Sequence, residues 1–352
     1  MTQGGQVPVK EGDEDWRAAV EAKSEQGLRS IDLQRAAEPG RGREAKTPSE
    51  ITSLGWKDIL WRVLWSIPAD RVLSTAGGVA FFALLAVFPA IATIVSLYGL
   101  FADASTVATH LTLLTSILPG GVLALIGDQI TRIASQDTDK LGLAFVIGLV
   151  IALWSANSGV AALFDALNVV YGEKEKRSIP RFYLTTFLFT FGAIGFILAA
   201  IVAVIVLPLL LKFVGSSTTS EQFLAILRWP VLLLVVMLSL ACVYRFGPSR
   251  RDAKWRWVTS GSVVASLLWI GASMLFSWYV ANFDSYNRTY GSLGAGVGFM
   301  TWIWISAVIV LLGGELNAEM EHQTAQDTTQ GRPKPLGARG ANMADHVGAA
   351  QD

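Results

Sequence analysis

The sequence has few of the residues that build catalytic and metal sites. Its 352 residues include one cysteine and three histidines. The single cysteine, Cys242, lies in an apolar run, which excludes an intramolecular disulfide and a thiolate metal cluster. No Gly-rich loop precedes a Lys-Ser or Lys-Thr pair, and no HExxH motif is present. We therefore expect no cofactor, no bound metal and no catalytic residues.

Charge is also scarce. Charged residues make up 16% of the chain, against about 25% in a typical globular protein, and the formal net charge is zero. A nucleic-acid partner is not expected, because binding would need a basic surplus clustered on one face. Three long stretches, 72–101, 183–211 and 258–283, have no charged residue at all. With 52% hydrophobic residues, this composition is typical of an integral membrane protein.

The two ends of the chain differ from its middle. Residues 1–50 hold 18 of the 56 charged residues and contain no apolar segment typical of a secretory signal peptide. Residues 323–352 are rich in Gly, Pro, Thr, Gln and Ala. Neither segment has apolar periodicity, so we expect two disordered tails around a membrane domain at 51–322.

Six apolar runs in this domain are candidates to cross a bilayer, which takes about 20 residues. The predicted spans are 74–101, 141–170, 183–211, 229–244, 258–283 and 293–314. The fourth is short, but Arg228 and Arg245 at its ends can extend their charges to the membrane surface. The fold class is therefore an all-α polytopic membrane protein.

Two further segments are predicted to be amphipathic helices lying on the membrane. From Trp56, apolar residues recur at three and four positions, with Lys57, Asp58 and Arg62 on the opposite face. Packing of this helix on other protein is compatible with the same pattern. Residues 102–140 carry two short apolar stripes, which predict helices on the outer face that either cap a cavity or are only interfacial.

Lysine and arginine in the short loops predict the orientation. Two loops, 172–181 and 245–257, share nine of them: Lys174, Lys176, Arg177, Arg181, Arg245, Arg250, Arg251, Lys254 and Arg256. The connections on the other side have five over longer segments: Arg132, Lys140, Lys212, Arg228 and Arg288. We expect both termini to be cytoplasmic, which agrees with an even number of spans.

Polar residues inside a span are costly and point to candidate functional positions. At 100° per residue, Asn157, Asp165 and Asn168 lie within about 80° of one another in the second span. They are predicted to form either one wall of a substrate or proton path, with Glu315 near its mouth, or a set of structural hydrogen bonds. Glu315 and Glu319 share a face at the end of the sixth span; pairing with Arg71 or the basic loops is expected, and binding of a cationic group is the alternative.

Small and hydroxyl residues in the last two spans favour helix packing. In the fifth span four serines lie on one face, and in the sixth two glycines have the GxxxG spacing. They are Ser262, Ser266, Ser273 and Ser277, and Gly294 and Gly298.

Three segments resemble the YihY/BrkB family of bacterial inner-membrane proteins. The first runs from Ala80 to Pro89 (AFFALLAVFP), the second from Leu153 to Gly172, and the third from Tyr290 to Glu319, ending LGGELNAE. The similarity covers about residues 56–322. Phe82 stands where the family pattern has tyrosine, and Gly314 where alanine is usual.

The resemblance implies six spans, a location in the bacterial plasma membrane, and links to virulence, serum resistance and export of envelope lipid or solute. A ribonuclease label also attached to this family gains no support from the residues. Two hypotheses remain: a transporter of an envelope lipid or small solute that does not hydrolyse ATP, and a non-transporting scaffold for the envelope. Membrane lipids are the expected partners.

Overall fold

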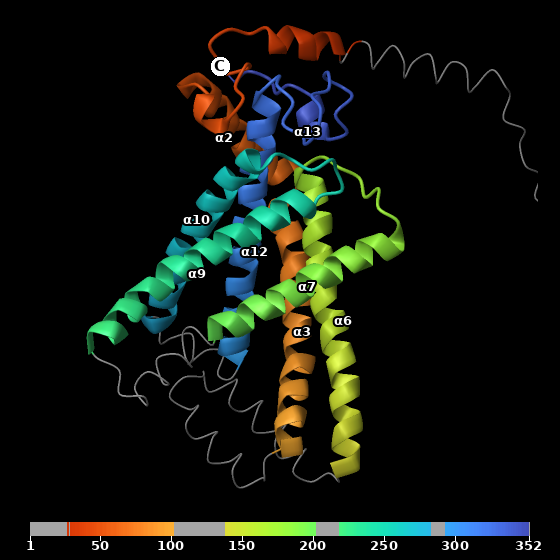
Figure 1. Cartoon of the computed structure of the whole chain (residues 1–352), viewed down its shortest axis with the longest axis vertical. Helices are drawn as coiled ribbons and strands as arrows, with labels where there is room; N and C mark the ends of the chain where they lie inside the picture. Colours follow the sequence, from red (N-terminus) through yellow and green to blue (C-terminus); the bar gives the residue numbers. More distant parts are fainter. Residues whose placement is uncertain (1–26, 28, 102–137, 202–217, 283–292, 352) are drawn as a thin grey trace, which may run out of the picture.

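The computed structural model describes residues 27, 29–101, 138–201, 218–282 and 293–351, and the regular elements in these ranges are helices (Figure 1). One isolated β-bridge joins Ala253 to Thr329. Six of the helices are long and apolar enough to cross a membrane. They are α3 (Val72–Phe101), α6 (Thr138–Val170), α7 (Ile179–Ile201), α9 (Thr218–Phe246), α10 (Trp255–Asn282) and α12 (Leu293–Gln323). The predicted all-α membrane fold with six spans is confirmed. The expected helix pair at 102–140 lies mostly outside the described residues.

The long helices are apolar on the outside as well as inside. Leu184 and Leu188 on α7, and Met274 and Leu275 on α10, are each more than half exposed. Such surfaces are unfavourable in water but are required against lipid, where a helix also satisfies its own backbone hydrogen bonds. The outward side chains therefore belong to the surface that contacts the bilayer.

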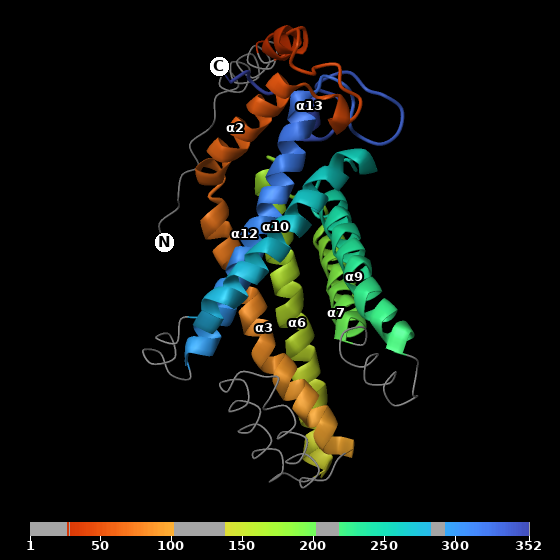
Figure 2. The same ribbon diagram turned by 90° about the vertical axis from the view of Figure 1, so that its left-hand side faces the viewer.

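The helices pack in a continuous series. α9 lies on α10, α10 on α12, α12 on α3, α3 along α6, and α6 on α7 (Figures 1 and 2). Leu167 of α6, Tyr244 of α9 and Leu311 of α12 are fully buried at the centre of the largest apolar cluster. The Tyr244 hydroxyl donates a hydrogen bond of 2.8 Å to the Val310 carbonyl of α12.

α10 and α12 approach most closely at two glycines. A Cβ on Gly261 would collide with the carbonyl oxygen of Gly313, and one on Gly313 would collide with the Tyr244 hydroxyl. Asn317 holds this contact, because its Oδ1 accepts from the Gly261 N–H at 2.8 Å and its Nδ2 donates to the Val258 carbonyl. Small residues are thus needed here for backbone contact.

Both described chain ends lie in one layer at a single end of the helices (Figure 1). We call it the terminal layer, defined as residues 29–71, 171–178, 247–254 and 324–351. It includes η1 (Pro48–Glu50), α2 (Ser53–Ala69) and α13 (Asn342–Asp345). The basic loops and the described parts of both tails therefore share one side of the protein.

The structure packs the tail segments 29–50 and 324–351, for which the sequence predicts disorder. Ala341, Ala344 and Val347 are buried, although no apolar period marks them. Arginine side chains order the segment instead, by donating to its backbone carbonyls. Arg43 donates to the carbonyls of Gln323 and Gly348. Sequence periodicity does not record hydrogen bonds of this kind, so the pattern alone indicated a disordered tail.

α2 shows the amphipathic pattern predicted from Trp56, with its charged face turned inward. Asp58 and Arg62 are buried against the terminal layer. Leu60, Trp61 and Leu64 are about half exposed on the other face. An apolar stripe of this kind suits the boundary between lipid and headgroups.

The glycine contact generates a stability prediction. Gly261→Ala should lower the melting temperature in detergent, because the new Cβ meets the Gly313 backbone and overpacking typically costs about 1–3 kcal/mol. Gly271→Ala on the same helix is the matched control, since its Cβ would meet open space and alanine favours the helix. The measurement is thermal unfolding of both purified variants. Equal melting temperatures for the two variants would contradict the assignment of this contact.

Candidate functional site

The polar residues predicted in the second span occupy different environments on α6. Asn157 is buried against α7, where the Thr190 hydroxyl donates to its Oδ1 at 3.4 Å. Thr190 and Thr186 are themselves buried on α7. Asn157 therefore lies in a polar contact between two helices.

Asn168 connects the end of α6 to both basic loops. Its Oδ1 accepts from the Ser249 N–H at 2.6 Å, and its Nδ2 donates to Glu175 at 3.1 Å. Glu175 also accepts from the side chain and the backbone of Arg177. Burial alone would raise the pKa of Glu175, but these hydrogen bonds outweigh it and lower the pKa to about 2. Asn168 and Glu175 thus hold the two basic loops against the end of α6.

Asp165 does not join these amides. It is exposed on α6, whereas Asn157 and Asn168 are buried and already hydrogen-bonded. The three side chains therefore have different surroundings. The three residues lie within about 80° around the helix axis, as expected from the sequence. Neighbouring elements cover Asn157 and Asn168 but not Asp165.

The serine face of α10 turns toward α12 in part. Ser262 and Ser266 are buried and donate to carbonyls of their own helix. Ser273 is half-buried and accepts from the Trp302 indole of α12 at 3.4 Å, and Ser277 is exposed.

The GxxxG pair of α12 makes no described close contact. A Cβ at Gly298 would meet open space. The surroundings of Gly294 lie outside the described residues. The close glycine contact of this helix is at Gly313 instead.

Three carboxylates are buried at the terminal-layer end of α12. Glu319 pairs with Arg62 of α2 at 2.5 Å and lies 3.3 Å from His322, and Glu321 pairs with Arg250 at 2.6 Å. The partner of Glu319 is thus Arg62, in place of the expected Arg71 or basic loops. Each pair ties α12 to another part of the terminal layer.

Glu315 differs from its two neighbours. Its side chain is fully buried, and neither carboxylate oxygen has a hydrogen-bond donor among the described residues. The side chain that interacts with it most strongly is another carboxyl, that of Asp70, between α2 and α3. Burial raises the pKa of Asp70, and the charge of Glu319 acts in the same direction. The geometry supplies a carboxyl pair without a compensating cation.

Asp70 and Arg62 are not among the site residues predicted from the sequence. Asp70 could have been noticed as an acidic residue directly before an uncharged span. Arg62 and Asp58 are four residues apart and hence on one face of α2, which could have marked that face as paired. Their link to α12 spans about 250 residues of sequence and appears only in the fold.

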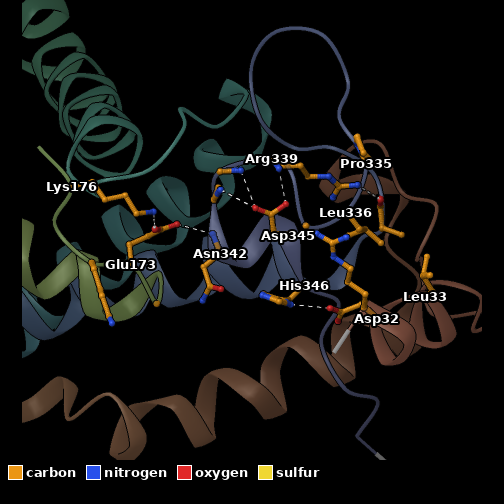
Figure 3. A pocket seen from close by; sticks show the side chains of 17 residues that line it. Asp32, Leu33, Glu173, Lys176, Pro335, Leu336, Arg339, Asn342, Asp345 and His346 are labelled. Carbon is orange, nitrogen blue, oxygen red and sulfur yellow. Dashed lines mark hydrogen bonds and ion pairs between the residues drawn. The ribbon is translucent and has the colours of Figure 1, made fainter. Parts of the chain in front are cut away.

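A cavity of about 820 Å³ opens in the terminal layer (Figure 3). Its acidic residues hold the wall together. Glu173 accepts from Lys176 and from the Asn342 N–H, and Asp32 accepts from His346 and from the Val347 N–H.

Arg339 is the cation that anchors the wall of this cavity. It is nearly fully buried, and its guanidinium donates to the carbonyls of Ala325, Gln326, Lys334 and Ala344. The main polar groups of the wall therefore form hydrogen bonds that stabilise the folded C-terminal tail.

The sequence places this architecture in a family. The profile of the family described as virulence factor BrkB matches residues 64–336, most of the chain. The chain belongs to this family. The residues that match the family profile include all six spans and the end of α12 that bears the buried carboxylates.

Relatives of this BrkB-family chain are named in two ways. YfkH of Bacillus subtilis, whose name describes it as ribonuclease-like, is 32% identical over 249 residues, covering 70% of this chain and 88% of that protein. A UPF0761 membrane protein of Vibrio vulnificus is 25% identical over 271 residues, covering 75% and 84%. No solved structure shows significant similarity. The name of the Vibrio vulnificus relative describes a membrane protein, which agrees with the six apolar helices of this chain.

The cavity wall generates a prediction for the tail. Arg339→Ala should make residues 324–351 accessible to proteinase K, because each buried carbonyl left without a donor costs about 1–3 kcal/mol. Arg332→Ala is the matched control, since Arg332 is exposed in the same segment. Mass spectrometry of the digests measures the outcome. Equal cleavage of the two variants would show that Arg339 does not order the tail.

Proposed function

We propose that this protein resides in the bacterial inner membrane and moves an envelope lipid or a small solute across it without hydrolysing ATP. Under this proposal both termini and the terminal layer are cytoplasmic. The support for this orientation is that the basic loops 172–181 and 245–257 lie largely within the terminal layer, and lysine and arginine concentrate on the cytoplasmic side of membrane proteins.

The observation that carries the transport proposal is Glu315. An ionisable side chain buried in a membrane-spanning helix without a partner is costly, and such residues commonly mark ion or substrate paths. A residue needed only for packing would not require a charge. Asp165, Asn157 and Asn168 are not placed on the path, because the first is exposed and the other two have structural partners.

A non-transporting scaffold is the second candidate. It is favoured by the hydrogen bonds of Asn157 and Asn168, which join α6 to α7 and to both basic loops. Such bonds fit a rigid membrane module. The scaffold hypothesis does not explain why a carboxyl is buried at Glu315.

No enzyme activity is proposed. Among the described residues, no group of three or more His, Cys, Asp or Glu side chains is placed to hold a metal ion. The description of one relative as ribonuclease-like belongs to that relative.

The orientation can be tested by cysteine labelling in a Cys242→Ser background. Ser178→Cys, at an exposed position in the terminal layer, should not react with an impermeant maleimide added to intact cells and should react after lysis. Ser135→Cys, in the connection between the first two spans, should react from outside. The opposite pattern would overturn the proposed orientation.

Transport can be tested in vesicles containing the purified protein. One set carries a fluorescent phosphatidylethanolamine whose flipping is read by dithionite quenching, and another is loaded with amino acids and sugars whose release is read by mass spectrometry. Wild type should move at least one probe, and Glu315→Gln should slow it about tenfold or more, equivalent to about 1.4 kcal/mol. Asp165→Asn, an exposed carboxylate changed in the same way, should match wild type. If folded wild type moves neither class, or if Glu315→Gln is as fast as wild type, the transport proposal fails and the scaffold is favoured.

A further inference from the structure

The described residues do not satisfy the buried carboxyl of Glu315 as an anion. Its side chain is fully buried, and both oxygens are without hydrogen-bond donors in the described part of the chain. A buried carboxylate normally has a cation or several N–H donors, because losing hydration is otherwise very costly. Glu315 has neither, so its ionised form is poorly accommodated here.

The nearby cations are already committed to other groups. All three guanidinium nitrogens of Arg62 donate, to Glu319, Gln323 and the Ala349 carbonyl among others. His322 lies against the same Glu319 carboxylate. Arg71, beside Asp70, is exposed, and the buried Arg250 pairs with Glu321, so among the described residues no cation is paired with Glu315.

The other elements packed around Glu315 do not supply a charge of the right sign. α3 has no charged residue, and the charged residue of α10, Arg256, is exposed. Directly after α6, the uncharged phenol of Tyr171 lies near Glu315 and beside Asn317. Glu319, one turn along α12, adds a negative charge.

The group that interacts most strongly with Glu315 is the carboxyl of Asp70, and the two can share a hydrogen bond only when one of them carries a proton. Two ionised carboxylates have no hydrogen to share, whereas a protonated carboxyl is a donor. Asp70 is held there by the turn between α2 and α3, in which Arg71 has the left-handed φ of 50°. The pair can therefore form a hydrogen bond once it holds a proton.

We propose that Asp70 and Glu315 together bind one proton at the terminal-layer end of α12. The proton goes onto one carboxyl and is donated to the other, so that the buried pair carries one negative charge. Coupling of this proton to the movement of a lipid or solute rests on the proposed function. Proton binding itself does not depend on it.

The direct test is infrared spectroscopy of the full-length protein in lipid nanodiscs near neutral pH. Wild type should show the C=O stretch of a protonated carboxylic acid, shifted in D₂O, and the band should disappear in Glu315→Gln and in Asp70→Asn. Asp165→Asn should retain the band. Absence of the band from wild type, or its persistence in both pair variants, would overturn the proposal even if a variant were unstable.

A second measurement uses the pH dependence of melting. A native state that holds a proton released on unfolding loses stability as pH rises. Wild type should therefore melt progressively lower from about pH 5 to about pH 8, and Glu315→Gln should reduce this slope while Asp165→Asn leaves it unchanged. An unreduced slope in Glu315→Gln would contradict a proton on this pair. So would stabilisation of wild type by sodium at fixed pH, which would indicate a metal cation as the ligand.

The two proposals fail in different ways. A band that depends on Glu315, in a protein that moves no probe, would retain the proton site and reject transport. Probe movement in a protein that lacks the band would retain transport and reject the proton site.

Discussion

The cost of burying carboxylates at one end of α12 governs how the terminal layer is built. Glu319 and Glu321 each lie against a buried arginine from elsewhere in the chain, Arg62 and Arg250. A buried charge must be paired or neutral, and removing one partner of such a pair is strongly destabilising. These pairs fix α2 and the 247–254 loop around α12, and they leave Glu315 as the carboxyl that a cation does not compensate.

The same arginine chemistry orders the C-terminal segment. Arg43, Arg62 and Arg339 donate to backbone carbonyls of residues 323–349, which gives a Gly- and Pro-rich tail its partners. The buried polar backbone is thereby satisfied without a regular element. The tail is held by the N-terminal segment, α2 and the basic loops, so the terminal layer closes one end of the helix series as a unit.

The spans were predictable because the bilayer imposes a length and a composition on each of them. Amphipathicity predicted α2 as well, yet the pattern could not show which face meets protein. Because Asp58 and Arg62 are charged, the sequence pattern would place their face of α2 in water. In the fold that face is turned inward, because Asp58 pairs with Arg41 and Arg62 pairs with Glu319. Helix periodicity gives the angle between residues, whereas their environment depends on which element packs on each side.

The sequence by itself determined the helical membrane class, the six spans and the concentration of positive charge in the two loops that the fold places in the terminal layer. Only the tertiary structure decided which polar residues act together. Asn157, Asp165 and Asn168 share helical angles but differ in exposure, because α7 and the loops cover two of them and not the third. Asp70 and Glu315 are far apart in sequence, and they interact because α2 and α3 both pack on α12. Contacts between distant segments leave no period in a sequence, so their chemistry appears only when the chain is folded.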